Sequence, residues 1–171
     1  MDTYFDLGGY SFPVTTQSTE AQTWFDRGIL WTYGYNHEEA VTCFERAIET
    51  DPQCAMAHWG AGYASGPNYN MPWDLFDDAG RTAAARAGYT HARKALDLID
   101  GVTGWEAALI RALPKRYPKP DPLDPKAMKA WNASFADAMR DAFDAHPESH
   151  EVRTVFAESL LNLTPWKMWD L

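Results

Sequence analysis

Four polar side chains in the first half of the sequence are the first candidates for chemistry: His37, His58, Asn68 and Asn70. Imidazole changes its charge near neutral pH and binds metal ions, so a histidine in a pocket can act as an acid, a base or a ligand. Asparagine amides orient a bound polar group by donating and accepting hydrogen bonds. If these side chains line one pocket within the fold, they would form the small-molecule or metal site of an enzyme.

The sequence signatures of common catalytic and metal sites are absent, however. The five histidines contain no H-E-x-x-H motif, and neither Cys43 nor Cys54 stands at metal-ligand spacing from a histidine. The chain has no phosphate-binding P-loop, no G-x-G-x-x-G motif and no G-x-S-x-G nucleophile elbow. We therefore expect no catalytic residue, no metal and no cofactor, and we interpret both cysteines as buried thiols. Catalysis is kept as the alternative function.

Segment 66–76 is the strongest candidate for contact with a partner. Its prolines and asparagines exclude a continuing helix, and about eleven extra residues are more than two helices need as a connection. Tyr69 and Trp73 would offer apolar contact area, while the two asparagines could read a peptide backbone. In the alternative interpretation the loop folds back and plugs the core with Met71 and Trp73.

Charge and composition limit the classes of partner. Twenty-four acidic and fifteen basic residues give a formal net charge of -9, which repels phosphate backbones and anionic lipid. No apolar run approaches the roughly 20 residues that a membrane helix needs. The first residues lack the basic and apolar regions of a secretory signal. We expect no nucleic-acid partner, no membrane partner and a cytoplasmic location.

The elements that must position these residues are helices, because strand-like alternation is confined to short fragments near 10–14. Segment 115–125 holds four prolines and is predicted to be a stiff surface connection. Residues that favour helix ends are Gly34, Gly101 and Pro114. A long helix is predicted from about Leu75 to Ile99. Residues that favour helix starts are Thr19 with Gln22, Asn36, Asp51 with Pro52, Thr103 with Glu106, Asp124 with Pro125, and Ser149.

One stretch fits a known helical repeat of 34 residues. Residues 21–54 resemble a tetratricopeptide repeat (TPR), with an arginine and a tryptophan replacing the usual leucine and tyrosine of the first helix. The residues that carry the resemblance are Trp24, Gly28, Trp31, Ala40, Phe44, Ala47 and Pro52. The resemblance implies that small residues lie where two helices touch and that aromatic rings fill the gaps between successive helix pairs.

The resemblance predicts an all-α fold in which antiparallel helix hairpins stack as a TPR-like right-handed solenoid. Residues 1–17 would be an extended N-terminal segment, and residues 18–171 one helical repeat domain. The later copies of the repeat are degenerate. The predicted pairs span about 19–50, 53–99 and 103–146, with a partial fourth pair at 150–171.

Three further stretches, 51–60, 67–70 and 157–166, resemble a family of much longer TPR proteins, mostly bacterial and poorly characterised. That family offers no established catalytic residues to transfer. The resemblance implies that the chain corresponds to the N-terminal part of such a protein. Trp166 and Trp169 would then pack against the continuing C-terminal repeats, or against a second copy in a homodimer.

The predicted function is a scaffold that binds a protein or peptide, with segment 66–76 as a contact element. The alternative is a small-molecule or metal-binding enzyme with a pocket around His58, Asn68 and Asn70. A purely structural cap for a longer solenoid is a third possibility. Repeat scaffolds share their packing residues and differ in their grooves, so the sequence does not name the partner. The candidate contact residues are His37, His58, Asn68, Tyr69, Asn70 and Trp73.

Overall fold

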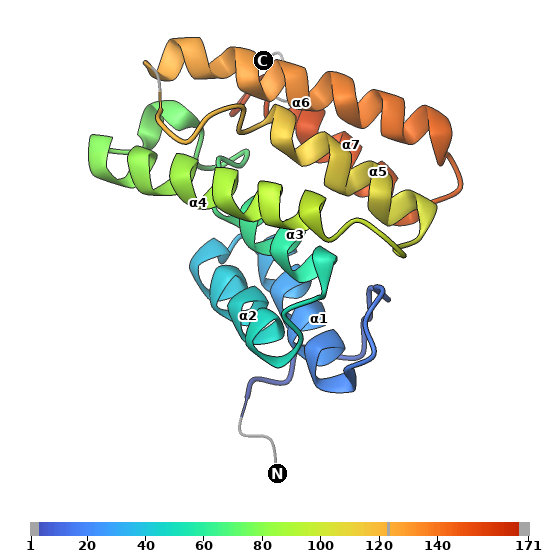
Figure 1. The fold of residues 1–171 in the computed structure, drawn as a ribbon. Helices are drawn as coiled ribbons and strands as arrows, with labels where there is room; N and C mark the ends of the chain where they lie inside the picture. Colours follow the sequence, from blue (N-terminus) through green and yellow to red (C-terminus); the bar gives the residue numbers. More distant parts are fainter. Residues whose placement is uncertain (1–3, 123, 168–171) are drawn as a thin grey trace.

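The computed structural model describes residues 4–122 and 124–167 (Figure 1). Within these ranges the chain forms seven α-helices and two short 3-10 helices, and no strand occurs there. The predicted all-α class is confirmed. The elements are α1 (Thr19–Tyr33), α2 (His37–Thr50), α3 (Ala55–Ala64), η1 (Trp73–Leu75), α4 (Asp78–Asp97), α5 (Gly104–Ala112), η2 (Leu113–Lys115), α6 (Pro125–Ala145) and α7 (His150–Leu161).

Side-chain caps explain where four of the helices begin, and all four agree with the sequence prediction. Asn36 caps α2, Ser149 caps α7, and Asp124 caps α6 just before a proline in its first turn. Thr103 and Glu106 form the capping box of α5, in which each side chain binds the other residue's backbone N–H. These caps satisfy donors that the first turn of a helix leaves without partners.

The first helix begins one residue earlier than the sequence indicated. Ser18, not Thr19, is the N-cap of α1, and its hydroxyl accepts a hydrogen bond from the backbone of Ala21. Thr19 is the first helical residue. The fourth helix begins at Asp78 instead of near Leu75, because 73–75 forms a separate 3-10 turn.

The predicted start of the third helix at Asp51 and Pro52 is wrong. Helix α3 begins only at Ala55. The Asp51 carboxylate accepts a hydrogen bond from the backbone of Gln53 at 3.0 Å, so the Asp-Pro pair forms the turn between α2 and α3. Pro52 is exposed in that turn and does not pack between the helices.

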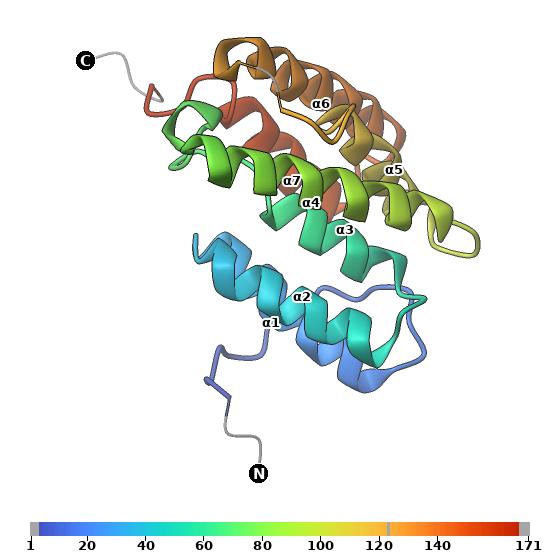
Figure 2. The same ribbon diagram turned by 60° about the vertical axis from the view of Figure 1, so that its left-hand side comes forward.

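Neighbouring helices in the sequence are also neighbours in space. Helix α1 packs on α2, α3 on α4, α5 on α6, and α6 on α7, while α3 also contacts α1, α2 and α5. Figures 1 and 2 show α1 and α2 at one end of the molecule, α3 and α4 in the middle, and α5, α6 and α7 at the other end. The helix pairs therefore form layers in chain order.

The ring of Phe44 fills the contact between the first two layers. A Cβ atom on Gly28 of α1 would lie 2.6 Å from Phe44 Cε1, and one on Gly60 of α3 would lie 2.4 Å from the same atom. Both distances are shorter than any van der Waals contact, so a side chain at either position would force the Phe44 ring to shift. Ala40 and Ala47 lie fully buried on the same helix as the ring. Small residues and one large ring together give this contact its packing density.

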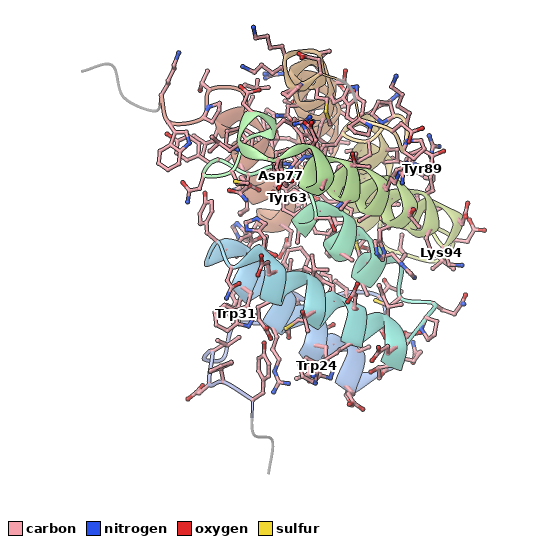
Figure 3. All side chains as sticks on the ribbon, turned by 90° about the vertical axis from the view of Figure 1, so that its left-hand side faces the viewer. Trp24, Trp31, Tyr63, Asp77, Tyr89 and Lys94 are labelled. Atoms are coloured by element: carbon pink, nitrogen blue, oxygen red, sulfur yellow. The ribbon has the colours of Figure 1, made fainter. Side chains whose placement is uncertain are left out.

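The other two aromatic residues of the repeat signature, Trp24 and Trp31, are only partly buried. The guanidinium groups of Arg27 and Arg46 lie 4.4 Å and 4.6 Å from the centre of the Trp24 ring. Trp31 donates a hydrogen bond from its indole nitrogen to the hydroxyl of Tyr4 at 2.7 Å. Figure 3 shows both tryptophans on the α1–α2 side of the molecule.

Residues 4–17 contain no helix or strand, yet they pack into the same core as the helices. Phe12 is fully buried, and its ring centre lies 5.5 Å from those of Phe25 in α1 and Trp105 in α5. Thr15 donates from its backbone and its hydroxyl to the buried carboxylate of Glu106, each at 2.6 Å. The segment therefore joins the first helix pair to the third.

Part of the predicted surface connection at 115–125 is buried, which corrects the sequence prediction. Residues 118–121 are exposed as expected, but Arg116 and Tyr117 are 1 % and 0 % exposed. The hydroxyl of Tyr117 donates to the carbonyl oxygen of Gly62 at 2.9 Å. Its ring also occupies the space that a side chain at Gly88 would need. Arg116 and Tyr117 therefore connect α3 and α4 to the next layer of helices in the chain.

Candidate functional site

The inserted loop 66–76 is anchored to the core at two points. Trp73 is 1 % exposed, and its ring packs near those of Phe76, Tyr117 and Trp131. At the other anchor, the guanidinium of Arg116 donates a hydrogen bond to the carbonyl oxygen of Pro67. The plug interpretation holds for Trp73, which serves the core and offers no surface to a partner. Met71, by contrast, is 36 % exposed.

Asn68 closes the tip of this loop. Its side-chain oxygen accepts hydrogen bonds from the backbones of Asn70 and Met71 at 2.9 Å and 3.0 Å. The backbones of Asn68 and Met71 also exchange hydrogen bonds with each other. The Asn68 oxygen therefore holds the loop in shape and is not free to read a peptide. Asn70 is exposed beside it.

The structure brings His37 and Asn68 together. The amide nitrogen of Asn68 lies 3.5 Å from His37 Nδ1, which joins the loop to the first turn of α2. Burial lowers the pKa of His37; a hydrogen bond with the Tyr35 backbone raises it, and the nearby cation of Arg116 lowers it further. The imidazole is therefore neutral at pH 7, and it can both donate and accept a hydrogen bond.

A cavity of about 460 Å³ opens beside this pair, between the start of α2 and the loop. We call it the His37 groove. Its wall combines exposed polar groups with apolar side chains, which is typical of a surface that binds another molecule. It is lined by Tyr35, Asn36, His37, Glu38, Val41, Ala64, Ser65, Gly66, Asn68, Met71 and Phe76.

A second cavity of about 350 Å³ lies between the end of α1 and α7, and we call it the Glu158 groove. Tyr35 lines both grooves, so the two meet at this residue. Tyr35 has a φ of 60°, in the left-handed region that few residues other than glycine adopt. The groove is lined by Thr32, Tyr33, Tyr35, Thr154, Ala157, Glu158 and Leu161.

Glu158 is the titratable group of the second groove. Burial raises its pKa from 4.5 to about 7, against a hydrogen bond with Asn162 that lowers it. Burial and the neighbouring acidic groups, Glu158 among them, also raise the pKa values of Tyr33 and Tyr35. Near neutral pH the carboxyl of Glu158 thus exists in both protonation states, and a cation placed beside it would favour the ionised one.

Exposed apolar side chains occur on the elements that form the two grooves and on the chain after α7. Trp166 is 64 % exposed, and its ring centre lies 6.0 Å from that of Tyr69 in the inserted loop. Tyr69 therefore contacts the C-terminal part of the described chain. Trp169, the other tryptophan of the predicted homodimer contact, lies outside the described residues. The other exposed apolar residues of this region are Tyr33, Tyr35, Met71, Leu160 and Leu163.

His58 does not take part in this site. Its Nδ1 atom lies 3.3 Å from Nδ1 of His91 in α4, and its Nε2 atom is buried without a hydrogen-bond partner. Burial lowers the pKa of His58 to about 4, with further lowering by His91 and Lys94. Asn68 contacts His37 instead, so the predicted pocket of His58 with Asn68 and Asn70 does not form. Among the described residues, no group of three or more metal-ligating side chains converges.

The sequence did not reveal the residues that contribute most to these grooves. Tyr33 and Tyr35 stand at a helix end and were not among the candidates, and Glu158 entered only as part of the stretch 157–166. The usable signal was Tyr35, because a large residue directly after Gly34 occupies the position where a helix end favours glycine. Arg116 gave no signal, since a cation in a proline-rich segment is usually exposed.

Comparisons with known proteins do not name a family: no family model, no curated protein and no solved structure matches the chain. The TPR resemblance therefore stays a prediction. In the part of the chain that the structure describes, no helix is long and apolar enough to span a membrane. The cytoplasmic location is likewise still a prediction.

Proposed function

We propose that this protein is a TPR-type scaffold that binds a segment of a protein partner in the joined His37 and Glu158 grooves. Layered helix pairs, with Phe44 set between Gly28 and Gly60, support the repeat architecture. Stacked pairs of this kind present grooves that take peptides or helices. The observation that carries the proposal is that Tyr35, in a conformation rare for its residue type, lines both cavities.

The charges favour a basic, amphipathic partner segment. The net charge of -9 steers cations toward the protein and repels nucleic acid. A lysine or arginine of the partner beside Glu158 would ionise this carboxyl and form an ion pair in a poorly hydrated groove. The rings of Tyr33 and Tyr35 would receive its aliphatic stem or an adjacent apolar side chain. Aromatic residues in such positions commonly dominate binding energy.

The inserted loop contributes to the proposed site through its shape. Asn68 orders the loop and contacts His37, while Met71 lines the groove. Deleting the loop would remove Trp73 from the core and unfold the protein, so point variants at the groove are the sharper test. Tyr35→Asn removes the ring and keeps a residue that tolerates the left-handed conformation. Glu158→Gln removes the charge.

Affinity capture from the source cells, quantified by mass spectrometry, tests the proposal. Wild-type protein is expected to retain one or more partners that Tyr35→Asn and Glu158→Gln lose by at least about tenfold. Glu20→Gln is the matched control, since Glu20 is exposed at the opposite end of α1. Circular dichroism confirms that each variant is folded. Equal retention of all partners by wild type and both groove variants would contradict the proposal.

A second occupant of the same region is supported by a separate observation. Leu160, Leu163 and Trp166 are exposed close to the end of the described chain. Further repeats of a longer chain, or a second copy of this one, would bury them. Trp166→Ser is expected to lower self-association of the 171-residue chain in sedimentation experiments. A chain that stays monomeric at about 100 µM, with or without Trp166, would exclude the second copy.

A further inference from the structure

A third cavity, away from both grooves, gathers positive charge. It has a volume of about 430 Å³ and lies between α4, the end of α5 and α6. Three cations line it: Arg93 of α4, Arg111 of α5 and Lys115 of η2. They come from separate elements and surround one space, in a protein whose net charge is -9. We call this cavity the basic pocket.

The three cations of the basic pocket have no acidic partner within the described ranges. Other basic side chains of the protein do have one: Arg86 pairs with Asp121 and Lys129 with Asp74. Asp97 follows Arg93 by one turn of α4, yet the two side chains make no ion pair. Three cations without counter-charges around one space give it a positive potential. An anion is the ligand that this potential favours.

The lining of the basic pocket also includes apolar side chains with flat rings. Trp131, only 6 % exposed, lines it together with Pro114 and Pro118. The hydroxyl of Ser134 adds one neutral hydrogen-bonding group. On the rim, the Arg93 guanidinium carbon lies 5.3 Å from the centre of the Tyr89 ring. This contact restricts the side chain, so less entropy is lost when it binds a ligand.

The geometry points to a binding site for a small phosphate monoester that carries a flat apolar group. A phosphate dianion matches two arginine forks and one lysine better than a single carboxylate does, because it offers more acceptor oxygens and more charge. The flat group would lie against Trp131 and the two prolines. A volume of about 430 Å³ suits a molecule of this size.

The basic pocket is independent of the proposed scaffold function. Tyr89 and Lys94, on either side of Arg93 in the second half of α4, lie along this helix away from its N-cap Asp77 (Figure 3). Its three cations line neither the His37 groove nor the Glu158 groove. A negative binding test at one site therefore does not bear on the proposal for the other site.

Titration calorimetry with phenyl phosphate tests the basic pocket. Wild-type protein in about 50 mM salt is expected to bind it saturably, with a Kd of about 1 mM or below, and more tightly than inorganic phosphate or benzoate. Arg93→Ala and Arg111→Ala should each weaken binding by at least about tenfold. Arg86→Ala is the matched control on α4, and it should leave the affinity unchanged. All three arginines are exposed, so the variants should stay folded.

Three results would overturn this assignment. The first is the absence of saturable phenyl phosphate binding up to about 10 mM. The second is binding that Arg86→Ala weakens as much as Arg93→Ala does. The third is binding of a hexaglutamate peptide to the wild type without any binding of phenyl phosphate. That result would assign the pocket to an acidic protein partner instead of a small phosphate compound.

Discussion

Arg116 holds the inserted loop by donating a hydrogen bond to the carbonyl oxygen of Pro67, 49 positions earlier in the chain. Its guanidinium carbon also lies 5.3 Å from the ring centre of Tyr63 and 5.2 Å from that of Phe135. No carboxylate of the described chain pairs with it, and burial lowers its pKa. The loop that shapes the His37 groove thus rests on a buried cation.

Two substitutions of Arg116 separate the contribution of its packing to stability from the contribution of its charge. Arg116→Ala leaves a cavity and a carbonyl oxygen without a donor, so a loss of roughly 2–4 kcal/mol in the free energy of unfolding is expected. Arg116→Met also leaves this carbonyl oxygen without a donor, but it fills the volume without a buried charge, so a smaller loss of about 1 kcal/mol is expected. Urea denaturation measures both values. Equal, large losses in the two variants would show that the charge itself stabilises the fold.

Gly60 tests the contact between the first two helix layers. Gly60→Ala places a methyl group 2.4 Å from Phe44 Cε1, and the resulting strain should exceed the roughly 1 kcal/mol that alanine contributes to helix propensity. We expect a net loss of about 1–2 kcal/mol, partly recovered by Phe44→Leu in the same chain. Gly9→Ala is the control, since its Cβ would meet no atom within 4 Å. No recovery in the double variant would contradict this packing.

Glu158 should make stability fall as pH rises. Its pKa is about 7 in the folded protein and 4.5 as the unperturbed value, so between these pH values the folded state binds more protons than the unfolded state. Relative to Glu158→Gln, the wild type should lose roughly 1–2 kcal/mol between pH 5 and pH 8, because the side chain is only partly exposed. Urea denaturation at both pH values measures this. Parallel pH profiles for the two proteins would exclude it.

His58 should make stability fall as the pH falls. Its pKa is lowered from 6.5 to about 4, so the unfolded state binds a proton first as pH falls. The wild type should therefore lose about 2 kcal/mol relative to His58→Gln between pH 7 and pH 4.5. Thermal or urea unfolding of both proteins across this range tests the prediction. A variant with the same acid sensitivity as the wild type would assign that sensitivity to other groups.

Local signals in the sequence predicted most of the helix boundaries correctly. The caps at Asn36 and Ser149 depend only on neighbouring residues. Gly101 has the predicted left-handed conformation, with a φ of 87°, but α4 already ends at Asp97, before this glycine. The helix start predicted at Asp51 and Pro52 was wrong because an Asp-Pro pair can either cap a helix or form a turn. Only the packing of α3 decides between the two outcomes.

The candidate site was harder to predict, because it depends on residues distant in sequence. The alternative enzyme interpretation required His58 and Asn68 to converge, but His58 lies six residues before the end of α3, roughly 9 Å along the helix. Its side chain faces His91, while Asn68 faces His37. Arg116 and Glu158 acquire their properties from burial, and burial is not visible in their own neighbourhoods.

Photo-crosslinking in the source cells tests the central claim, that the joined grooves bind a protein partner, most directly. Benzoylphenylalanine would replace Tyr35 in one protein and Glu20 in a second, at opposite ends of α1. The account predicts covalent adducts from position 35, mapped by mass spectrometry to a lysine- or arginine-containing amphipathic segment of another protein, and none from position 20. Absence of adducts at position 35, or the same adducts at both positions, would contradict it.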